Sequence, residues 1–202
     1  MLKKIFSSLI LVLLIWNYLT SFWLTYEVLS EIDAANFLWN KNIIENHSLD
    51  TEKYRLGDNI SRKETIKIMV KVSWLTVEDK CEWVFSDVAN DWSCKYIELA
   101  LKQGFIAKAD KFRPDDNISK TEALKMILKS KWILKTTKTT NWQEDYMQTA
   151  FEYWLIPAKY SDYDAKAKRW WIFQITTATL KKEQQIKDIQ SKNQNLYSEE
   201  AL

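Results

Sequence analysis

The sequence predicts an all-α fold made of three helix–loop–helix repeats. Two observations carry this prediction: a stretch of sixteen residues that recurs after 58 positions, and a shorter amphipathic pattern that occurs three times. A single unit of this kind has an apolar face that it cannot bury alone. We therefore expect the three units to pack around one shared core.

The longer repeat consists of YRLGDNISRKETIKIM at residues 54–69 and FRPDDNISKTEALKMI at residues 112–127, which align without a gap. Each copy contains the spacing S-x-x-E, first as Ser61 and Glu64 and then as Ser119 and Glu122. In such a capping box the serine accepts a hydrogen bond from the glutamate's backbone amide, and the glutamate accepts one from the serine's amide. The spacing predicts a helix that starts at each serine.

The shorter pattern reads AANFLWNKNII at 34–44, YIELALKQGFI at 96–106 and YMQTAFEYWLI at 146–156. Each copy predicts a short amphipathic helix followed by a pair of apolar residues. The third copy is followed by AKRWWIFQITTATL, which lacks S-x-x-E. When Arg169 is aligned with Arg62 and Lys120, this segment becomes the third copy of the capped helix. The expected units are 32–80, 81–135 and a degenerate 140–182, followed by a polar helical tail at 183–202.

The first 25 residues have a composition of their own. Lys3 and Lys4 precede an apolar run at 5–24, which is typical of a secretory signal peptide. An uncleaved signal anchor is the alternative, because the run has about the 20 residues that span a bilayer. We expect a secreted or cell-surface protein whose only membrane contact would be this segment.

Charge, motifs and cysteine content exclude several classes of function and predict a disulfide. The 29 Lys and Arg residues are balanced by 27 Asp and Glu, so nucleic-acid binding is not expected. We find no G-x-S-x-G, H-E-x-x-H or Gly-rich phosphate loop, and predict no catalytic residues and no cofactor. With a single histidine no metal site is expected. In an exported protein Cys81 and Cys94 predict a disulfide, with two buried thiols as the alternative.

Tryptophan is unusually frequent and glycine unusually rare, with 11 and 2 residues. Trp154 aligns with Gly104 at the end of a short helix, and Trp74 aligns with Trp132 just after the two capped helices. Helices commonly end in a left-handed residue, for which glycine is preferred. We hypothesise that UGA codons that the source organism reads as glycine are written here as tryptophan. The positions concerned are Trp74, Trp83, Trp132, Trp154 and Trp170, and the alternative is a true tryptophan-rich binding surface.

With these repeats the chain resembles the S-layer homology family. FSDVANDW at 85–92 is similar to its F-x-D-V opening followed by Trp, YIELALKQGFI to its first helix, and FRPDDNIS with ISKTEA to its turn and I-T-R-A-E-x signature. Residues 85–130 carry nearly the whole pattern. Residues 32–73 match its middle and end, and 142–180 match loosely.

The resemblance implies a non-catalytic protein in which three repeats form a pseudo-threefold helical bundle. The grooves between repeats would bind acidic, often pyruvylated, cell-wall polysaccharide. Carried over by motif, the carbohydrate-binding residues would be Arg62, Lys120, Arg169, Asp87, Trp92 and Trp171. The three cations would meet the anionic group, Asp87 would orient the opening loop, and Trp92 would stack on a sugar ring. Lysine at 120 departs from the usual arginine and lacks its bidentate geometry.

Simpler interpretations remain for these residues. The three cations could be solvated side chains of a first helical turn, Trp92 a core residue, and Asp87 a helix cap. The whole protein could also be an envelope scaffold that binds other envelope proteins and no carbohydrate.

Overall fold

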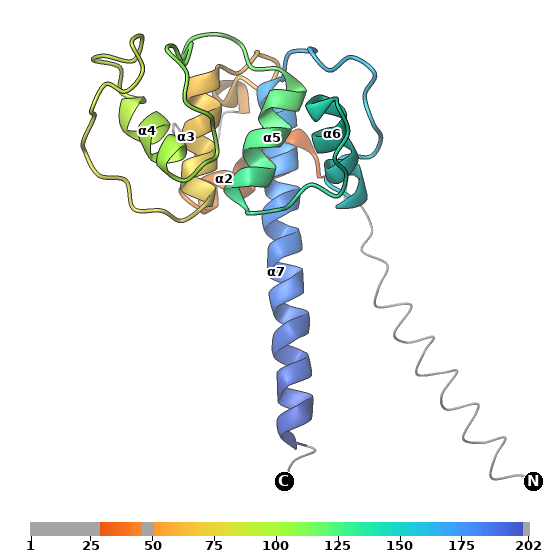
Figure 1. The fold of residues 1–202 in the computed structure, drawn as a ribbon. Coiled ribbons are helices and arrows are strands. Elements are labelled where there is room, and N and C mark those ends of the chain that lie inside the picture. Colours follow the sequence, from red (N-terminus) through yellow and green to blue (C-terminus); the bar gives the residue numbers. More distant parts are fainter. Residues whose placement is uncertain (1–28, 46–50, 200–202) are drawn as a thin grey trace, which may run out of the picture.

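The computed structural model describes residues 29–45 and 51–199, and within them it contains six α-helices, a short 3-10 helix and no strand (Figure 1). The elements are α2 (Glu31–Asn40), η1 (Thr51–Tyr54), α3 (Arg62–Val72), α4 (Cys94–Lys102), α5 (Lys120–Ser130), α6 (Trp142–Glu152) and α7 (Arg169–Glu199). The all-α prediction is confirmed. None of the described helices has both the length and the apolarity needed to cross a membrane. The predicted signal segment at 1–25 lies outside the described residues.

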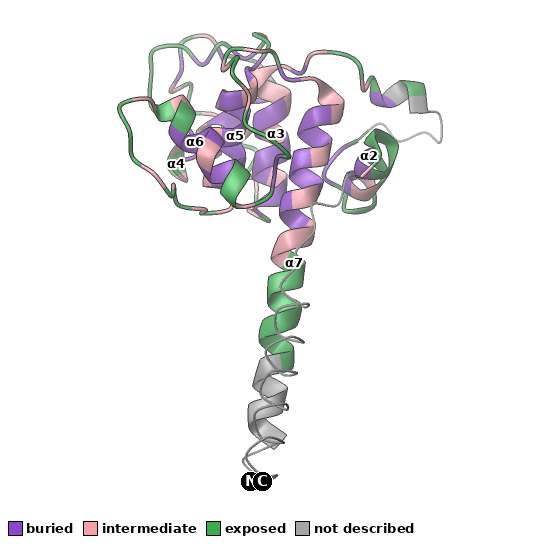
Figure 2. Ribbon diagram, turned by 90° about the vertical axis from the view of Figure 1, so that its right-hand side faces the viewer, coloured by how far each residue is buried: buried purple, intermediate pink, exposed green. Residues whose placement is uncertain are grey.

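The helices pack in pairs. The short helix α4 packs against α3, α6 packs against α5, and α2 packs against α7. Their facing sides form one buried core, in which Leu38, Ile66, Ile97, Leu124 and Phe173 are among the fully buried side chains. Helix α7 extends well past the other helices, and only its N-terminal part is covered by them (Figure 2). The predicted polar tail is a continuation of this helix.

Both capping boxes are present as predicted. Ser61 accepts from the amide of Glu64 at 3.3 Å, and the Ser61 amide donates to Glu64 Oε2 at 3.0 Å. Ser119 and Glu122 form the same pair of bonds at 3.2 and 3.1 Å. The third long helix, which lacks such a box, begins at Arg169, as the alignment of the repeats predicts.

A ring of backbone hydrogen bonds joins the segments that lead into α3, α5 and α7. The Ile60 amide donates to the Ala167 carbonyl at 3.1 Å, the Ala167 amide to the Ile118 carbonyl at 2.9 Å, and the Ile118 amide to the Ile60 carbonyl at 3.1 Å. All three side chains are fully buried. The starts of the three long helices are therefore tied directly to one another.

Four tryptophans have the left-handed backbone that favours glycine. Trp154 has a φ of 57°, and the residues aligned with it, Asn42 and Gly104, have φ values of 57° and 74°. Trp74 and Trp132, which end α3 and α5, have φ values of 56° and 53°. An indole at such a position is sterically strained. The backbone at these three tryptophans therefore supports the glycine hypothesis.

The remaining two candidates differ from each other. Trp83 has a φ of 55°, and its ring, like those of the other three, is more than half exposed. Trp170 is not among the positive-φ residues and lies in the first turn of α7, so its backbone gives no reason for a glycine. The glycine hypothesis itself stays a prediction.

Candidate functional site

Two of the three predicted cations form ion pairs between repeats. Arg62 Nη1 lies 2.7 Å from Glu122 Oε1, and Arg169 Nη1 lies 2.7 Å from Glu64 Oε1. The two arginine side chains are 12% and 17% exposed. Each arginine thus joins its own helix to the capping glutamate of another. These residues are neither solvated nor free to meet an anion, because their charge is already neutralised.

Glu64, the partner of Arg169, is stabilised as a carboxylate. Burial acts to raise the pKa of Glu64, but hydrogen bonds from Ser61 and the charge of Arg169 hold it below its ordinary value. Arg62 also donates from Nε to the Phe112 carbonyl at 2.9 Å. The geometry assigns Arg62 and Arg169 a structural role in joining the repeats.

Lys120 is placed differently. Its Nζ lies 4.4 Å from the Tyr160 ring centroid and 5.6 Å from that of Trp171, and it forms no ion pair with any carboxylate in the described part of the chain. The reason is that α7 carries Trp171 where α3 and α5 carry their capping glutamates. Lys120 therefore keeps its charge available for a ligand.

Trp171 is a core residue. Its side chain is 3% exposed and its Nε1 donates to the Tyr160 hydroxyl at 3.1 Å. The expectation that it contacts carbohydrate is corrected by this burial, because a sugar cannot reach its ring face.

Asp87, which was expected to orient the opening loop, joins that loop to the turn ahead of α5. Its two carboxylate oxygens accept from the amides of Phe112 and Arg113 at 2.8 and 2.7 Å. Arg113 has a positive φ of 59°, so the carboxylate holds a sharply turned backbone just ahead of α5. It does not cap the next helix.

Trp92 is exposed beside lysines. Its ring, 48% exposed, meets Tyr96 edge to face at a centroid distance of 6.1 Å. Lys67 Nζ lies 5.2 Å from the Trp92 centroid and Lys63 Nζ 5.7 Å from it. The core interpretation of Trp92 is therefore wrong, and the site offers an aromatic face next to positive charge.

A second aromatic site of the same kind was not predicted. Trp142 and Tyr146 meet edge to face at 6.3 Å, and Lys125 Nζ lies 4.7 Å from the Trp142 centroid. Lys125 is 58 positions after Lys67, and both sites share the spacing W-x-x-x-Y, which could have revealed the second site. Burial, with Lys129 nearby, lowers the pKa of Lys125.

The third helix pair has no such site. The positions of α2 and α7 that correspond to the Trp, the Tyr and the Lys are Ser30, Ala34 and Gln174. Gln174 donates to the Leu29 carbonyl at 2.6 Å. We refer below to the site of Lys67, Trp92 and Tyr96 as the first aromatic site and to that of Lys125, Trp142 and Tyr146 as the second.

The loop that borders the first aromatic site is held by a disulfide. Cys81 and Cys94 are bonded, with their Cα atoms 5.7 Å apart. Glu98 adds a second attachment by accepting from the amides of Glu82 and Val84 at 2.7 and 2.9 Å. With the ion pair between Asp79 and Lys95, the loop at 73–93 is thus fixed to α4 at three places.

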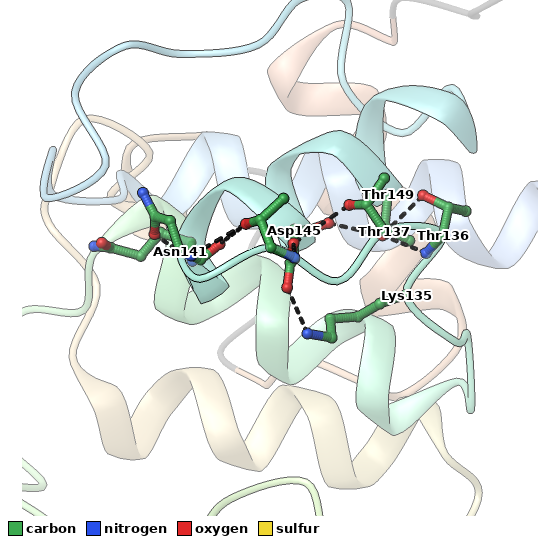
Figure 3. A network of polar contacts seen from close by, with 8 residues as sticks. Lys135, Thr136, Thr137, Asn141, Asp145 and Thr149 are labelled. Carbon is green, nitrogen blue, oxygen red and sulfur yellow. Dashed lines mark hydrogen bonds and ion pairs between the residues drawn. The ribbon is translucent and has the colours of Figure 1, made fainter.

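The loop that borders the second aromatic site is held by a buried carboxylate (Figure 3). Asp145, whose side chain is 1% exposed, accepts from Lys135 Nζ at 2.6 Å and from the Thr139 amide at 2.7 Å. The hydrogen bond from Lys135 is the main reason why the pKa of Asp145 is lowered to about 2. A side chain of α6 therefore fixes the loop that precedes it.

Residues 84–124 match the family model of the S-layer homology domain. The match includes Asp87, Trp92, helix α4 and the second capping box. No curated protein matches the chain. The resemblance is thereby confirmed for this segment, which is similar to the S-layer homology domain. Domains of this family generally serve as cell-surface anchoring modules.

Proposed function

We propose that this protein binds anionic cell-wall polysaccharide, of the pyruvylated or otherwise carboxylate-bearing kind, and so anchors or organises the cell surface. The observation that carries the proposal is the first aromatic site, where an exposed Trp92 lies beside Lys63 and Lys67 within the family match. A tryptophan face packs against the C–H groups of a sugar ring, and the lysines around it, although paired with Asp91 and Glu45, add positive charge that attracts a carboxylate. The pair suits an acidic sugar better than a neutral one.

We further propose that three units, at 32–80, 81–135 and 140–182, form the pseudo-threefold bundle. The backbone ring of Ile60, Ile118 and Ala167 supports this arrangement, because each segment is bonded to both others in the same direction. Between such units the helix pairs α3–α4 and α5–α6 each carry an aromatic site, and α2–α7 carries none. Two of the three grooves would then bind polysaccharide.

Cosedimentation with purified cell walls tests the proposal. We expect the exported protein to sediment with walls and to lose binding when the wall carboxylates are amidated with a carbodiimide and an amine. The variant W92A should bind about tenfold more weakly, since loss of one stacking face is worth about 1.4 kcal/mol. W132A, which removes an indole of similar exposure outside both aromatic sites, is the matched control. A wild-type protein that stays in the supernatant would overturn the proposal.

The alternative of an envelope scaffold is favoured by one observation. Past the domain, α7 exposes Ile186 and Ile189, which are 44% and 45% exposed and three positions apart on one helix face. Under this alternative a truncation after residue 183 would abolish capture of the envelope partner. Wall binding through Trp92 would be absent from the start, so the sedimentation experiment separates the two functions.

A further inference from the structure

We propose that the cavity beside Trp92 binds a single acidic sugar residue, whose carboxylate pairs with Lys80 and whose ring stacks on Trp92. The inference rests on the proposed function and deepens it. It assigns to Lys80 the anion-binding role that the sequence motif assigns to Arg62. It also makes the site dependent on the disulfide between Cys81 and Cys94.

The cavity has the size and lining of a saccharide site. Its volume is about 570 Å³, and Lys67, Lys80, Cys81, Trp92, Lys95 and Tyr96 are among its lining residues. Small-molecule sites commonly have volumes of about 300–1,000 Å³. The exposed Trp92 and its neighbour Tyr96 give the cavity an apolar wall, and three lysines and three carboxylates line the rest of it.

Among the charged residues that line the cavity, one lysine has no carboxylate partner in the described part of the chain. Lys67 Nζ lies 3.0 Å from Glu45 Oε2, and Lys95 Nζ lies 2.9 Å from Asp79 Oδ1. The third lining carboxylate, Asp91, lies 2.9 Å from Lys63 Nζ, outside the lining. Lys80 is exposed and forms no ion pair with any residue that the structure describes. An entering carboxylate would therefore find its partner in Lys80.

The disulfide fixes Lys80 relative to Trp92. Lys80 directly precedes Cys81, and Cys81 is bonded to Cys94, which starts α4 two residues after Trp92. Cys94 is 2% exposed and part of the core. The anion-binding group and the stacking face are thus both attached at the same turn of α4. Without the covalent bond this stretch of the loop would be held to α4 by non-covalent contacts alone, from Glu98 to the amides of Glu82 and Val84 and from Lys95 to Asp79.

Reduction of the bond should therefore weaken the site. Dithiothreitol would transfer two electrons and two protons to the disulfide, giving the thiols of Cys81 and Cys94, and would itself become a cyclic disulfide. The second aromatic site lies beside a loop that is held by Asp145 and has no disulfide. It should keep its affinity under the same conditions.

Binding of soluble polysaccharide released from purified walls tests the inference, measured by calorimetry on the full chain carrying W142A to silence the second site. We expect K80A to lower the affinity about tenfold, the loss of one charge-assisted pair. K108A, which removes another exposed lysine, should bind like its parent. Polysaccharide with amidated carboxylates should bind K80A and its parent equally.

The test of the disulfide uses the W142A protein and the same soluble polysaccharide, with W92A in an otherwise wild-type chain for comparison. Dithiothreitol should lower the affinity about tenfold and should have little further effect on K80A, because both changes remove the same contact. The W92A variant, in which the second site remains, should be insensitive to the reductant. Helical circular dichroism checks that each protein is folded, and K80A still decides the outcome if reduction unfolds the chain.

The results separate the inference from the proposed function. If the wild-type protein binds the polysaccharide and K80A binds equally well, Lys80 is not the anion-binding group and the inference falls while wall binding stands. If the oxidised wild-type protein does not bind at all, the proposed function itself falls.

Discussion

The loop between α3 and α4 and the loop between α5 and α6 perform the same task by different means. Both follow a capped helix, both have a left-handed tryptophan, Trp74 or Trp132, as their second residue, and both lead to an aromatic site. The first is fixed by a disulfide and the second by the buried Asp145. The comparison teaches that the aromatic site is the repeated feature, whereas the attachment of the loop is specific to each copy.

Loop length gives a physical reason for the difference. The first loop, at 73–93, is longer than the second, at 131–141. The entropy lost on closing a loop rises with its length, and so does the stabilisation that a cross-link can supply. In the shorter loop the carboxylate of Asp145 reaches both Lys135 and the Thr139 amide, and Thr149 accepts from the Thr136 amide.

The largest expected effect comes from breaking the covalent attachment. The double variant C81S/C94S should lower the free energy of unfolding by about 3 kcal/mol, because the denatured chain regains the freedom of the closed loop. Urea unfolding followed by circular dichroism measures it. A parent protein kept in dithiothreitol should show the same midpoint as the variant. A change below about 1 kcal/mol would mean that the non-covalent contacts of Glu98 and Lys95 are enough to fix the loop.

A smaller change in the free energy of unfolding is expected from the left-handed tryptophan near the start of each loop. Trp74→Gly and Trp132→Gly should each stabilise the fold by about 1 kcal/mol, since relief of left-handed strain exceeds the added flexibility of glycine. The gain should be smaller at Trp132, whose ring meets Phe105 edge to face at 5.9 Å. Thermal unfolding of the single variants measures both.

Trp170→Gly is the matched control, because this tryptophan lies in a regular helix and its replacement should destabilise the fold by about 1 kcal/mol. Mass spectrometry of the native protein tests the glycine hypothesis itself. Tryptophan found intact at 132 and 154 would end that hypothesis.

The smallest expected effect on stability is that of Asp145, and it appears only at acid pH. The pKa of Asp145 is lowered from 3.8 to about 2, so its stabilising contribution is complete above pH about 4 and is lost as the pH falls toward 2. The variant D145N does not titrate, and its urea midpoint should fall less steeply across this window than that of the wild type. Equal slopes would contradict the assigned role.

Glu45, at the α3–α4 side, provides the comparison. Its pKa is also lowered to about 2, by hydrogen bonds from Lys71 and Lys67, but its side chain is 61% exposed. Salt should therefore screen the contribution of Glu45 and leave that of Asp145 largely unchanged. In 1 M sodium chloride E45Q and the wild type should have the same acid dependence.

The local features of this fold could be predicted from the sequence, whereas most of the site could not. Ser61 and Glu64 are three residues apart, so their spacing alone predicts the capping box. The partners of Arg62 and Arg169 lie 60 and 105 residues away, and no motif reports such a distance. Trp171 could equally well be a ligand platform or a core residue until its burial was known. The second aromatic site was missed because only its counterpart resembles the family closely.

The backbone ring of Ile60, Ile118 and Ala167 has a consequence for how the protein can fold and evolve. Stacked solenoid repeats have open ends, so they can gain units and can begin to fold anywhere along the array. A ring of three has no free position for a fourth segment. Its closure also requires Ile60 to meet Ala167, whose positions are far apart in the chain, and contacts of such separation slow folding. We therefore expect slow, all-or-none folding and a number of repeats that gene duplication cannot extend one at a time.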